Sequence, residues 1–349
     1  MEPDFFTDLP LELITNILSR LFVRSIAISK CVCRSWLDAL NSDDFADSHF
    51  SKSGPALAVL MPARIQIIDL RKRHRRRHTP LINSNFPHRA SITGAADGLL
   101  LLTSFPETIY VCNPIARQYA ELCNPPPSQF GTPAMYGFGA TKCKKYKVVR
   151  ITPESDCHVY TLGTEEMWRR VESETSFKYK YGGRSFGAFL NGNLHWMVLS
   201  DSDGRPWISC FDVETERFST LSAPASYGSL SCLRDCLCLF DNRWYNGPAI
   251  WMMKEYGVEK SWTKEYVLRA SPCFGCSYEF VYAIKVFKNG DILMLRDLEF
   301  LFYYSSEKKS SYELGAIHRG GEDEYINAIL VTPTFRTLQT LGIENVTSF

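Results

Sequence analysis

The sequence lacks the features that define membrane and secreted proteins. It has no run of about 18 uninterrupted apolar residues, and its acidic start, Met1–Asp4, lacks the basic region and apolar run of a signal peptide. Neither sign of charge is in excess, because 39 Lys and Arg stand against 38 Asp and Glu, so a surface devoted wholly to nucleic acid is disfavoured. Hydrophobic residues make up 45% of the 349 residues, which excludes wholesale disorder. These absences predict a folded, soluble intracellular protein of two or three domains, located in the cytoplasm, the nucleus or both.

The motifs of common enzyme classes are also missing. The sequence contains neither the Gly-x4-Gly-Lys-Ser/Thr loop that cradles phosphates nor the His-Glu-x2-His pair of zinc proteases. Gly183–Gly187 matches the Gly-x-Ser-x-Gly nucleophile elbow around Ser185, which needs a strand before it and a helix after it. Here a polar, turn-like segment precedes the pattern, and a predicted strand, Ala188–Leu190, follows it. The pattern therefore indicates a turn, and we expect no catalytic residue and no cofactor.

Cysteine is plentiful but forms no clear disulfide or metal pattern. The 12 cysteines of an intracellular chain are expected to be reduced thiols. Two groups have spacings that could in principle supply thiolates to zinc, namely Cys232, Cys236 and Cys238, and Cys273 with Cys276. However, residues 233–240 have the pattern of a largely buried strand, and free cysteine is among the most buried residue types. Core cysteines are thus favoured over a zinc site, and we expect no metal.

The first fifty residues show helical periodicity and carry more apolar surface than a small module can bury. Carboxylates at Asp8 and Glu12 favour a helix N-terminus, and Pro10 fits a first helical turn. At about 100° per residue, the apolar residues between 9 and 21 cover an arc of about 200°, roughly twice what a surface helix needs for one core. They are Leu9, Leu11, Leu13, Ile14, Ile17, Leu18 and Leu21. Further apolar residues follow at Phe22, Val23, Ile26, Ile28, Val32, Trp36 and Leu37.

Half of the apolar arc should face the other short helices, and the other half should face something else. Periodicity alone leaves two possibilities open. The second half packs either on the C-terminal body of this chain or on a separate protein. In the first case the chain would be a free-standing interaction module.

Three elements of this helical head occur in a fixed order. Asp8-Leu9-Pro10-x2-Leu13-x3-Ile17-Leu18-x2-Leu21 is followed by Ile26 and then by Lys30-Cys31-Val32-Cys33-Arg34-Ser35-Trp36. In residue type and spacing the head resembles an F-box. It departs from the family at Phe22, where a proline is usual, and at Ile26, where a leucine is usual, and both positions keep an apolar side chain.

The resemblance implies a three-helix module over residues 4–50. Such a module docks on a Skp-family adaptor, which ties it to the cullin scaffold of a ubiquitin ligase. By this resemblance the adaptor-facing residues are Leu9, Pro10, Leu13, Ile14, Ile17 and Leu18, with Val32 and Trp36 closing the module.

From about residue 55 onward, short β-rich runs alternate with Gly, Pro, Asn and Asp. A pair of strands ends each unit, and an aromatic residue of the second strand recurs about every 44 to 50 residues, at Tyr119, Trp168, Phe218, Trp262 and Tyr312. This period, with two more strands before each pair, is typical of a kelch-type propeller blade. A weaker first unit spans 57–81, and a last strand, Ala328–Val331, could return to close the ring. The pattern predicts six blades.

Several phrases of the body carry a second resemblance. They are Cys112-Asn113-Pro114-x2-Arg117, Tyr146-Lys147-Val148-Val149-Arg150, Val159–Gly163 with Trp168-Arg169, Phe189–Trp196, and Phe211-Asp212-Val213-x2-Glu216-x-Phe218. They resemble the F-box-associated domain of plant F-box proteins, which implies that residues 55–345 form that domain. The expected fold class is therefore α+β, with a small helical F-box followed by a mainly β, kelch-like propeller. The residues of these phrases, His195 included, are expected to be structural.

Together the two resemblances imply the substrate receptor of a cullin-based ubiquitin ligase, which catalyses no bond change itself. Its propeller would bind a target protein through loops on one rim of the ring. Tyr179, Tyr181, Trp244 and Tyr245 are the candidate contacts, because aromatic residues in polar, turn-rich segments have the composition of binding hot spots. A propeller enzyme and a nucleic-acid binder are two less favoured hypotheses.

The strongest charge run, Arg71 to Arg77, bears on location. A solvated hairpin loop in the first blade is the simplest interpretation. A nuclear-import signal comes second and a phosphate-contacting patch third.

Overall fold

A computed structural model describes residues 10–62, 64–70, 80–127, 134–153, 155–164, 166–172, 177–179, 187–200, 204–225, 228–241, 248–269, 281–296, 300–314 and 326–349. Four helices come first in this part of the chain, namely α1 (Leu11–Leu18), α2 (Val23–Ser29), α3 (Arg34–Leu40) and α4 (Asp43–Lys52). The sequence resemblance implies three, and the additional α4 begins where Ser42 Oγ accepts a hydrogen bond from Phe45 N (3.2 Å). No helix of the described residues combines the length and apolar character needed to cross a membrane.

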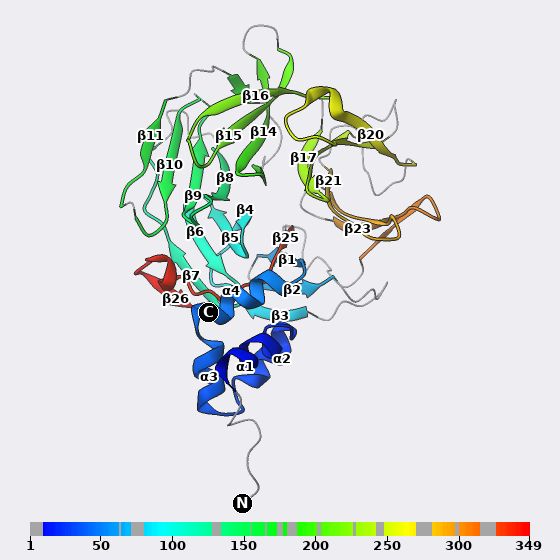
Figure 1. Cartoon of the computed structure of the whole chain (residues 1–349). Helices are drawn as coiled ribbons and strands as arrows, with labels where there is room; N and C mark the ends of the chain where they lie inside the picture. Colours follow the sequence, from blue (N-terminus) through cyan, green and yellow to red (C-terminus); the bar gives the residue numbers. More distant parts are fainter. Residues whose placement is uncertain are drawn as a thin grey trace, which may run out of the picture.

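Six antiparallel sheets follow, and each is one blade of a propeller (Figure 1). Blade 1 consists of β1 (Ala56–Met61), β2 (Arg64–Asp69), β3 (Pro80–Asn85) and β25 (Asn327–Val331). Blade 2 consists of β4 (Ser91–Ala96), β5 (Leu99–Ser104), β6 (Thr108–Asn113), β7 (Gln118–Glu121) and β26 (Val346–Ser348). Blade 3 consists of β8 (Met135–Ala140), β9 (Tyr146–Ile151), β10 (Cys157–Thr161) and β11 (Arg169–Val171).

The second half of the ring repeats this plan. Blade 4 consists of β12 (Phe177–Tyr179), β13 (Ala188–Leu190), β14 (Asn193–Ser200), β15 (Pro206–Asp212) and β16 (Phe218–Ser222). Blade 5 consists of β17 (Ser229–Leu233), β18 (Cys236–Asp241), β19 (Ala249–Met253) and β20 (Trp262–Val267). Blade 6 consists of β21 (Val281–Val286), β22 (Ile292–Arg296), β23 (Phe300–Ser305) and β24 (Ser310–Glu313). Single turns of 3₁₀-helix, Glu259–Ser261 and Gln339–Leu341, lie outside the sheets.

The six blades form a closed ring, as the sequence predicts. The innermost strands β25, β4, β8, β13, β17 and β21 lie beside one another in this order, and β21 lies beside β25. Closure comes from β25, which pairs with β1 from Ala56↔Val331 to Leu60↔Asn327, so that the two ends of the propeller share blade 1. The recurring aromatic residues lie in or next to the fourth strand from the ring centre in blades 2 to 6, with Tyr119 in β7, for example, and Tyr312 in β24.

Neighbouring blades pack face to face through their apolar side chains. All four leucines of Leu99–Leu102 are buried, because blade 2 has another blade on each side. Glycine allows a close approach of two blades at Gly137, where a Cβ atom would lie 2.5 Å from Cζ2 of the buried Trp196. Gly187, the last residue of the Gly-x-Ser-x-Gly pattern, packs on the same indole and is followed by β13, so packing explains this glycine.

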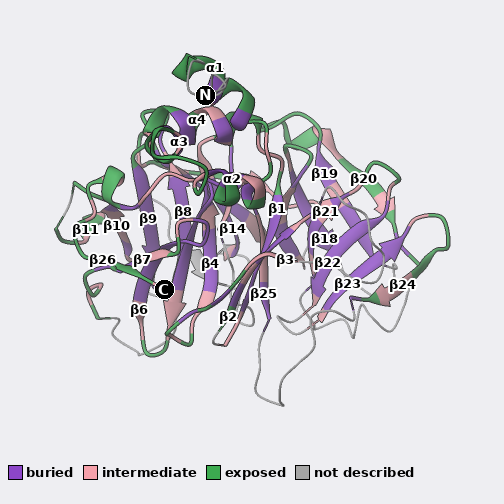
Figure 2. Ribbon diagram, turned by 90° about the horizontal axis from the view of Figure 1, so that it is seen from below, coloured by how far each residue is buried: buried purple, intermediate pink, exposed green. Residues whose placement is uncertain are grey.

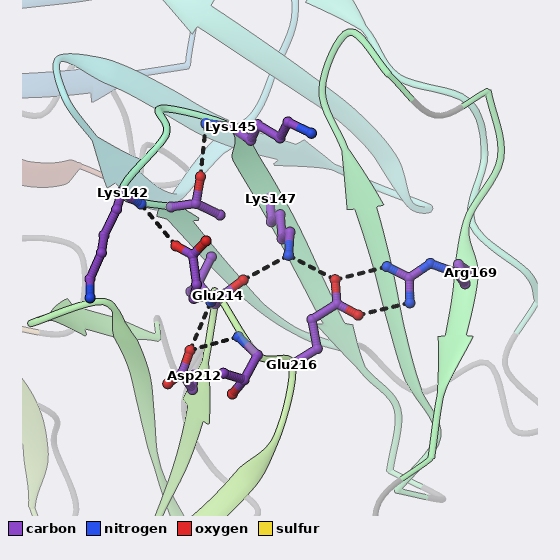
Figure 3. A network of polar contacts seen from close by, with 10 residues as sticks. Lys142, Lys145, Lys147, Arg169, Asp212, Glu214 and Glu216 are labelled. Carbon is purple, nitrogen blue, oxygen red and sulfur yellow. Dashed lines mark hydrogen bonds and ion pairs between the residues drawn. The ribbon is translucent and has the colours of Figure 1, made fainter.

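Polar groups also join the blades, for example between blades 3 and 4 (Figure 3). Lys147 Nζ donates to Val213 O (2.7 Å) and lies 2.8 Å from Glu216 Oε1, while both Glu216 oxygens accept from the guanidinium of Arg169 at 2.8 Å. Burial alone would raise the pKa of Glu216, but hydrogen bonds and charge from Arg169 and Lys147 outweigh it and hold that pKa below its usual value. Asp212 shapes the turn by accepting from the N–H groups of Glu214 and Thr215.

The ion pairs of Glu216 predict that removing its charge lowers the stability of the fold. We expect Glu216→Gln to lower the free energy of unfolding by about 2 kcal/mol or more, because the Lys147 side chain is only 11% exposed and would lose its carboxylate. Urea unfolding measures the effect. The matched control is Glu214→Gln, whose carboxylate accepts only at the surface, from Lys142 N at 3.0 Å, and should cost less than about 0.5 kcal/mol. Equal losses in the two variants would contradict this account.

His195 joins blades 4 and 5 and predicts a pH dependence. This buried imidazole donates from Nδ1 to Ala188 O (2.8 Å) and accepts at Nε2 from the Tyr256 hydroxyl (2.9 Å). Burial lowers the pKa of His195 to about 4, against the smaller opposing effect of the Ala188 hydrogen bond. The unfolded chain takes up this proton near pH 6.5, whereas the folded chain does so only near pH 4. His195 therefore makes its full contribution to the free energy of unfolding above pH 6.5. As the pH drops to 4, this contribution falls by at most about 3 kcal/mol.

The His195 contribution is measured by urea unfolding between pH 7 and pH 4. In His195→Gln the free energy of unfolding should fall less steeply between pH 7 and pH 4 than in the native chain. In Tyr256→Phe, which keeps the imidazole, it should fall as steeply as in the native chain. Parallel curves for the native chain and His195→Gln would show that His195 does not stay neutral in the fold.

Candidate partner-docking surface

Helix α1 divides its apolar side chains between two surfaces. Ile14 and Leu18, about one turn apart, are buried inside the head. Leu13 and Ile17 have the same spacing and are 48% and 56% exposed. The head interior is completed by Ile26, Leu40 and Phe45, with Leu21, Trp36 and Phe335 partly buried against it. The wide apolar arc of the sequence thus has one flank inside the head and one flank outside it.

More apolar side chains are exposed on the first three helices and the turns between them. Figure 1 shows these helices outside the ring, beside blades 1 and 2, and Figure 2 shows α1 above the ends of the strands. The large exposed residues are Leu11, Leu13, Ile17, Phe22, Ile28, Val32 and Leu37, which are 38% to 64% exposed. Together with the exposed Pro10, we call these residues the apolar head surface.

The structure divides the residues that the F-box resemblance assigns to the adaptor into an exposed group and a buried group. Pro10, Leu13, Ile17 and Val32 belong to the apolar head surface. Ile14 and Leu18 are buried, and Trp36 is half-buried against the head interior, so these three support the surface from beneath. Leu9 lies outside the described residues. Contact with an adaptor stays a prediction for the whole set.

Sequence reasoning did not assign Leu11, Phe22, Ile28 and Leu37 to the docking residues. The sequence did indicate them indirectly, because the head contains more apolar residues than it can bury. The periodicity of one helix could not show on which side of the module the residues of α2 and α3 lie.

Several other predicted features lie outside the described residues. Tyr179 is placed only as backbone in β12, while Tyr181, Trp244 and Tyr245 are not described, so the target-contact hypothesis stays a prediction. The basic run Arg71 to Arg77 and Ser185 are likewise outside the described part of the chain.

The three described cysteines whose spacing could in principle suit zinc lie in the packed strands β17 and β18. Cys238 is buried, and Cys232 and Cys236 are half-buried. Burial raises the pKa of Cys232 to about 12 and also raises that of Cys238, so the thiolate form that zinc requires is disfavoured. Cys273 and Cys276 lie outside the described residues, among which no group of three or more His, Cys, Asp or Glu has the arrangement of a metal site.

The head is joined to the propeller through α4 and α2. Phe50 of α4 lies under the Lys144 ammonium, 5.9 Å from the ring centre to Nζ, and Asp47 forms an ion pair with Arg336. Val23 of α2 is buried among apolar residues of blades 1 and 2. The head therefore packs on the body, but through Val23 and α4 and not through the second half of the apolar arc, which stays exposed at Leu13 and Ile17.

Comparison with known proteins agrees with both halves of this arrangement. Residues 59–339 match the family model of the F-box associated beta propeller domain, and residues 6–47 match that of the F-box domain. The chain belongs to the F-box-associated β-propeller family. The Arabidopsis thaliana F-box protein At3g07870 is 27% identical over 87% of this chain and 85% of its own length. The F-box protein CPR1 of the same plant is 25% identical over 75% of this chain and 73% of its own.

A third relative, the A. thaliana F-box/kelch-repeat protein At3g23880, is 26% identical over 74% of this chain and 78% of its own. The sequence resemblance to a plant F-box protein is thus confirmed. Among solved structures, a Bacteroides caccae protein of unknown function aligns with 80% of this chain and 99% of its own at 9% identity, with a TM-score of 0.42 that supports no argument.

An F-box followed by an F-box-associated propeller identifies the chain, in general terms, as a substrate adaptor of the SCF type. The F-box implies a partner of the Skp type in the same general sense. Both domains are typically non-catalytic.

Proposed function

We propose that this F-box protein recruits a target protein to a cullin-based ubiquitin ligase. The apolar head surface docks on a Skp-family adaptor, and the propeller binds the target. The observation that carries this proposal is the exposure of Leu13 and Ile17 on a head that is already seated on its own body. Packing on the propeller leaves this flank of α1 uncovered.

The size of the apolar head surface supports a protein partner. Full burial of a leucine or isoleucine contributes about 1.5 to 3 kcal/mol. Covering the half-exposed side chains would therefore contribute about 1 kcal/mol each before the cost of association is subtracted. Large apolar residues that gather on one small module in this way are typical of protein–protein contacts rather than of solvent-facing surface.

The two domains would then act by proximity. Binding of the adaptor and of the target to one chain raises the effective concentration of the target near the ubiquitin-transfer machinery that the cullin carries. No chemistry by this chain is needed for that effect. The head lies beside blades 1 and 2 (Figure 1), so the loops of blades 4 to 6, on the far side of the ring, stay available for a target.

The docking role predicts loss of adaptor binding without loss of fold. We expect Ile17→Asp to weaken binding of a purified Skp-family adaptor by about 100-fold or more, because a carboxylate would have to be buried at the interface. Leu13→Asp should act similarly. Calorimetry of the full-length chain with the adaptor measures the affinity, and the melting temperature should stay within about 2 °C of the native value, since both residues are exposed.

Val267→Asp is the matched control. Val267 is 64% exposed on β20 of blade 5, so the same change should leave adaptor affinity unaltered. If Ile17→Asp bound the adaptor as tightly as the native chain, the head would not dock through α1. If the native chain itself bound no adaptor, the free-standing interaction module would replace the proposed function.

A further inference from the structure

The C-terminal segment, residues 332–349, connects the ring centre with the head. It starts at the end of the innermost strand β25 and ends at the outer edge of blade 2, where β26 pairs with β7 through Val346↔Ala120. Between these two ends, Asn113 of β6 holds the backbone of the C-terminal segment. The buried Asn113 amide donates from Nδ2 to Thr334 O (3.2 Å) and Arg336 O (2.6 Å), and its Oδ1 accepts from Ile115 N (2.9 Å).

Between these two hydrogen bonds, Phe335 enters the head. Its ring lies 4.9 Å from the His49 ring in an edge-on arrangement and 6.1 Å from the Phe45 ring, and the Lys30 ammonium lies 5.3 Å from its centre. Phe335 is the described residue that packs against both the head interior and the core of blades 1 and 2. Since Val23 of the head is buried in that blade core, the two domains exchange apolar side chains.

Charged groups reinforce the junction around this ring. Arg336 forms an ion pair with Asp47 of α4. Lys144, in the turn between β8 and β9, lies over the Phe50 ring and is itself held by Asp97 Oδ2 at 2.6 Å. The contacts to α4 therefore come from the C-terminal segment and blade 3, while Val23 reaches blades 1 and 2.

We propose that Phe335 and Arg336 are positioning residues for the apolar head surface. The covalent link between α4 and β1 is only residues 53–55, which limits the distance of the head from the ring but not its rotation. Together with Val23 and the Lys144–Phe50 contact, Phe335 and Arg336 restrain that rotation and set one direction for the apolar head surface. The packing of Phe335 between the head and blades 1 and 2 does not depend on the proposed function. Its effect on the orientation of a bound adaptor does rest on the proposed function.

The first arm of the test uses the free, full-length chain. In Phe335→Ala, backbone amides of α1 and α4 should exchange with deuterium at least about tenfold faster, while amides of β22 and β23 in blade 6 keep their native rates. The matched control is Phe349→Ala. Phe349 belongs to the same segment and packs edge-on against Phe86 at 5.4 Å, but it is not part of the head interior, so α1 and α4 should exchange at native rates.

The second arm uses the complex with a purified Skp-family adaptor and reads orientation rather than affinity. Electron microscopy of the native complex should show one angle between adaptor and ring, and Phe335→Ala should broaden it into several while the Kd changes less than about threefold. Phe335→Leu, which keeps apolar volume, should restore the single angle. Asp47→Ala removes the ion pair from the head side without opening either core, so a wider spread of angles in this folded variant would test Arg336 separately.

Unchanged exchange in α1 and α4 of Phe335→Ala, or a single adaptor angle in that variant, would overturn the proposal. Should Phe335→Ala fail to fold, Asp47→Ala and Phe335→Leu keep both arms informative. Failure of the native chain to bind adaptor would count against the proposed function alone, because the exchange arm needs no adaptor.

Discussion

Antiparallel pairing of β25 with β1 closes the ring and joins the two ends of the propeller in one sheet. The same pairing determines where the head can sit. Val331 lies opposite Ala56, only a few residues after α4, so the segment that follows β25 emerges beside the helices. Phe335 can complete the head interior only because the ring has closed. Seating of the head and closure of the propeller are therefore two results of one long-range contact.

Buried polar groups join particular neighbouring blades, while apolar packing supplies most of the cohesion. An apolar core tolerates many arrangements, but a buried charge or imidazole is costly unless its partner is in place. Arg150, whose side chain is fully buried, meets Glu107 of blade 2 at 2.8 Å and 3.0 Å. Lys147 of blade 3, which is also buried, meets Glu216 of blade 4 at 2.8 Å, and the exposed Arg169 pairs with the same carboxylate. Blades 2, 3 and 4 thus carry polar groups that are satisfied only by one particular neighbour.

The blade number was predictable from the sequence because every blade repeats the same internal pattern. The aromatic residue in or next to the fourth strand of a blade recurs at a nearly fixed interval, and that interval is a local property of the chain. The partners of individual polar residues were not predictable in this way. Asn113 holds the C-terminal segment, and Glu216 holds Lys147 of another blade. Such contacts depend on how blades are placed around the ring, which no local pattern encodes.

The head shows the same division between local and long-range information. Periodicity revealed that α1 has too much apolar surface, yet it could not tell that Ile14 and Leu18 would be buried while Leu13 and Ile17 stay exposed. That choice depends on Phe45 of α4 and on Phe335, which lies almost at the other end of the chain. The start of α4 was visible in Ser42, Asp43 and Asp44, a cap followed by acidic residues. Its low apolar content hid the helix from a search for periodicity.

The surplus of apolar side chains in the head follows from its small size. Short helices enclose too little volume to bury both flanks of α1, so one flank is buried with Phe335 of the body and the other is left outside. A larger head could have buried both, and would then have had no apolar surface to share with another protein. Because the body already supplies the interior, the exposed flank is not needed for folding. A partner can therefore cover it and leave again without unfolding the head.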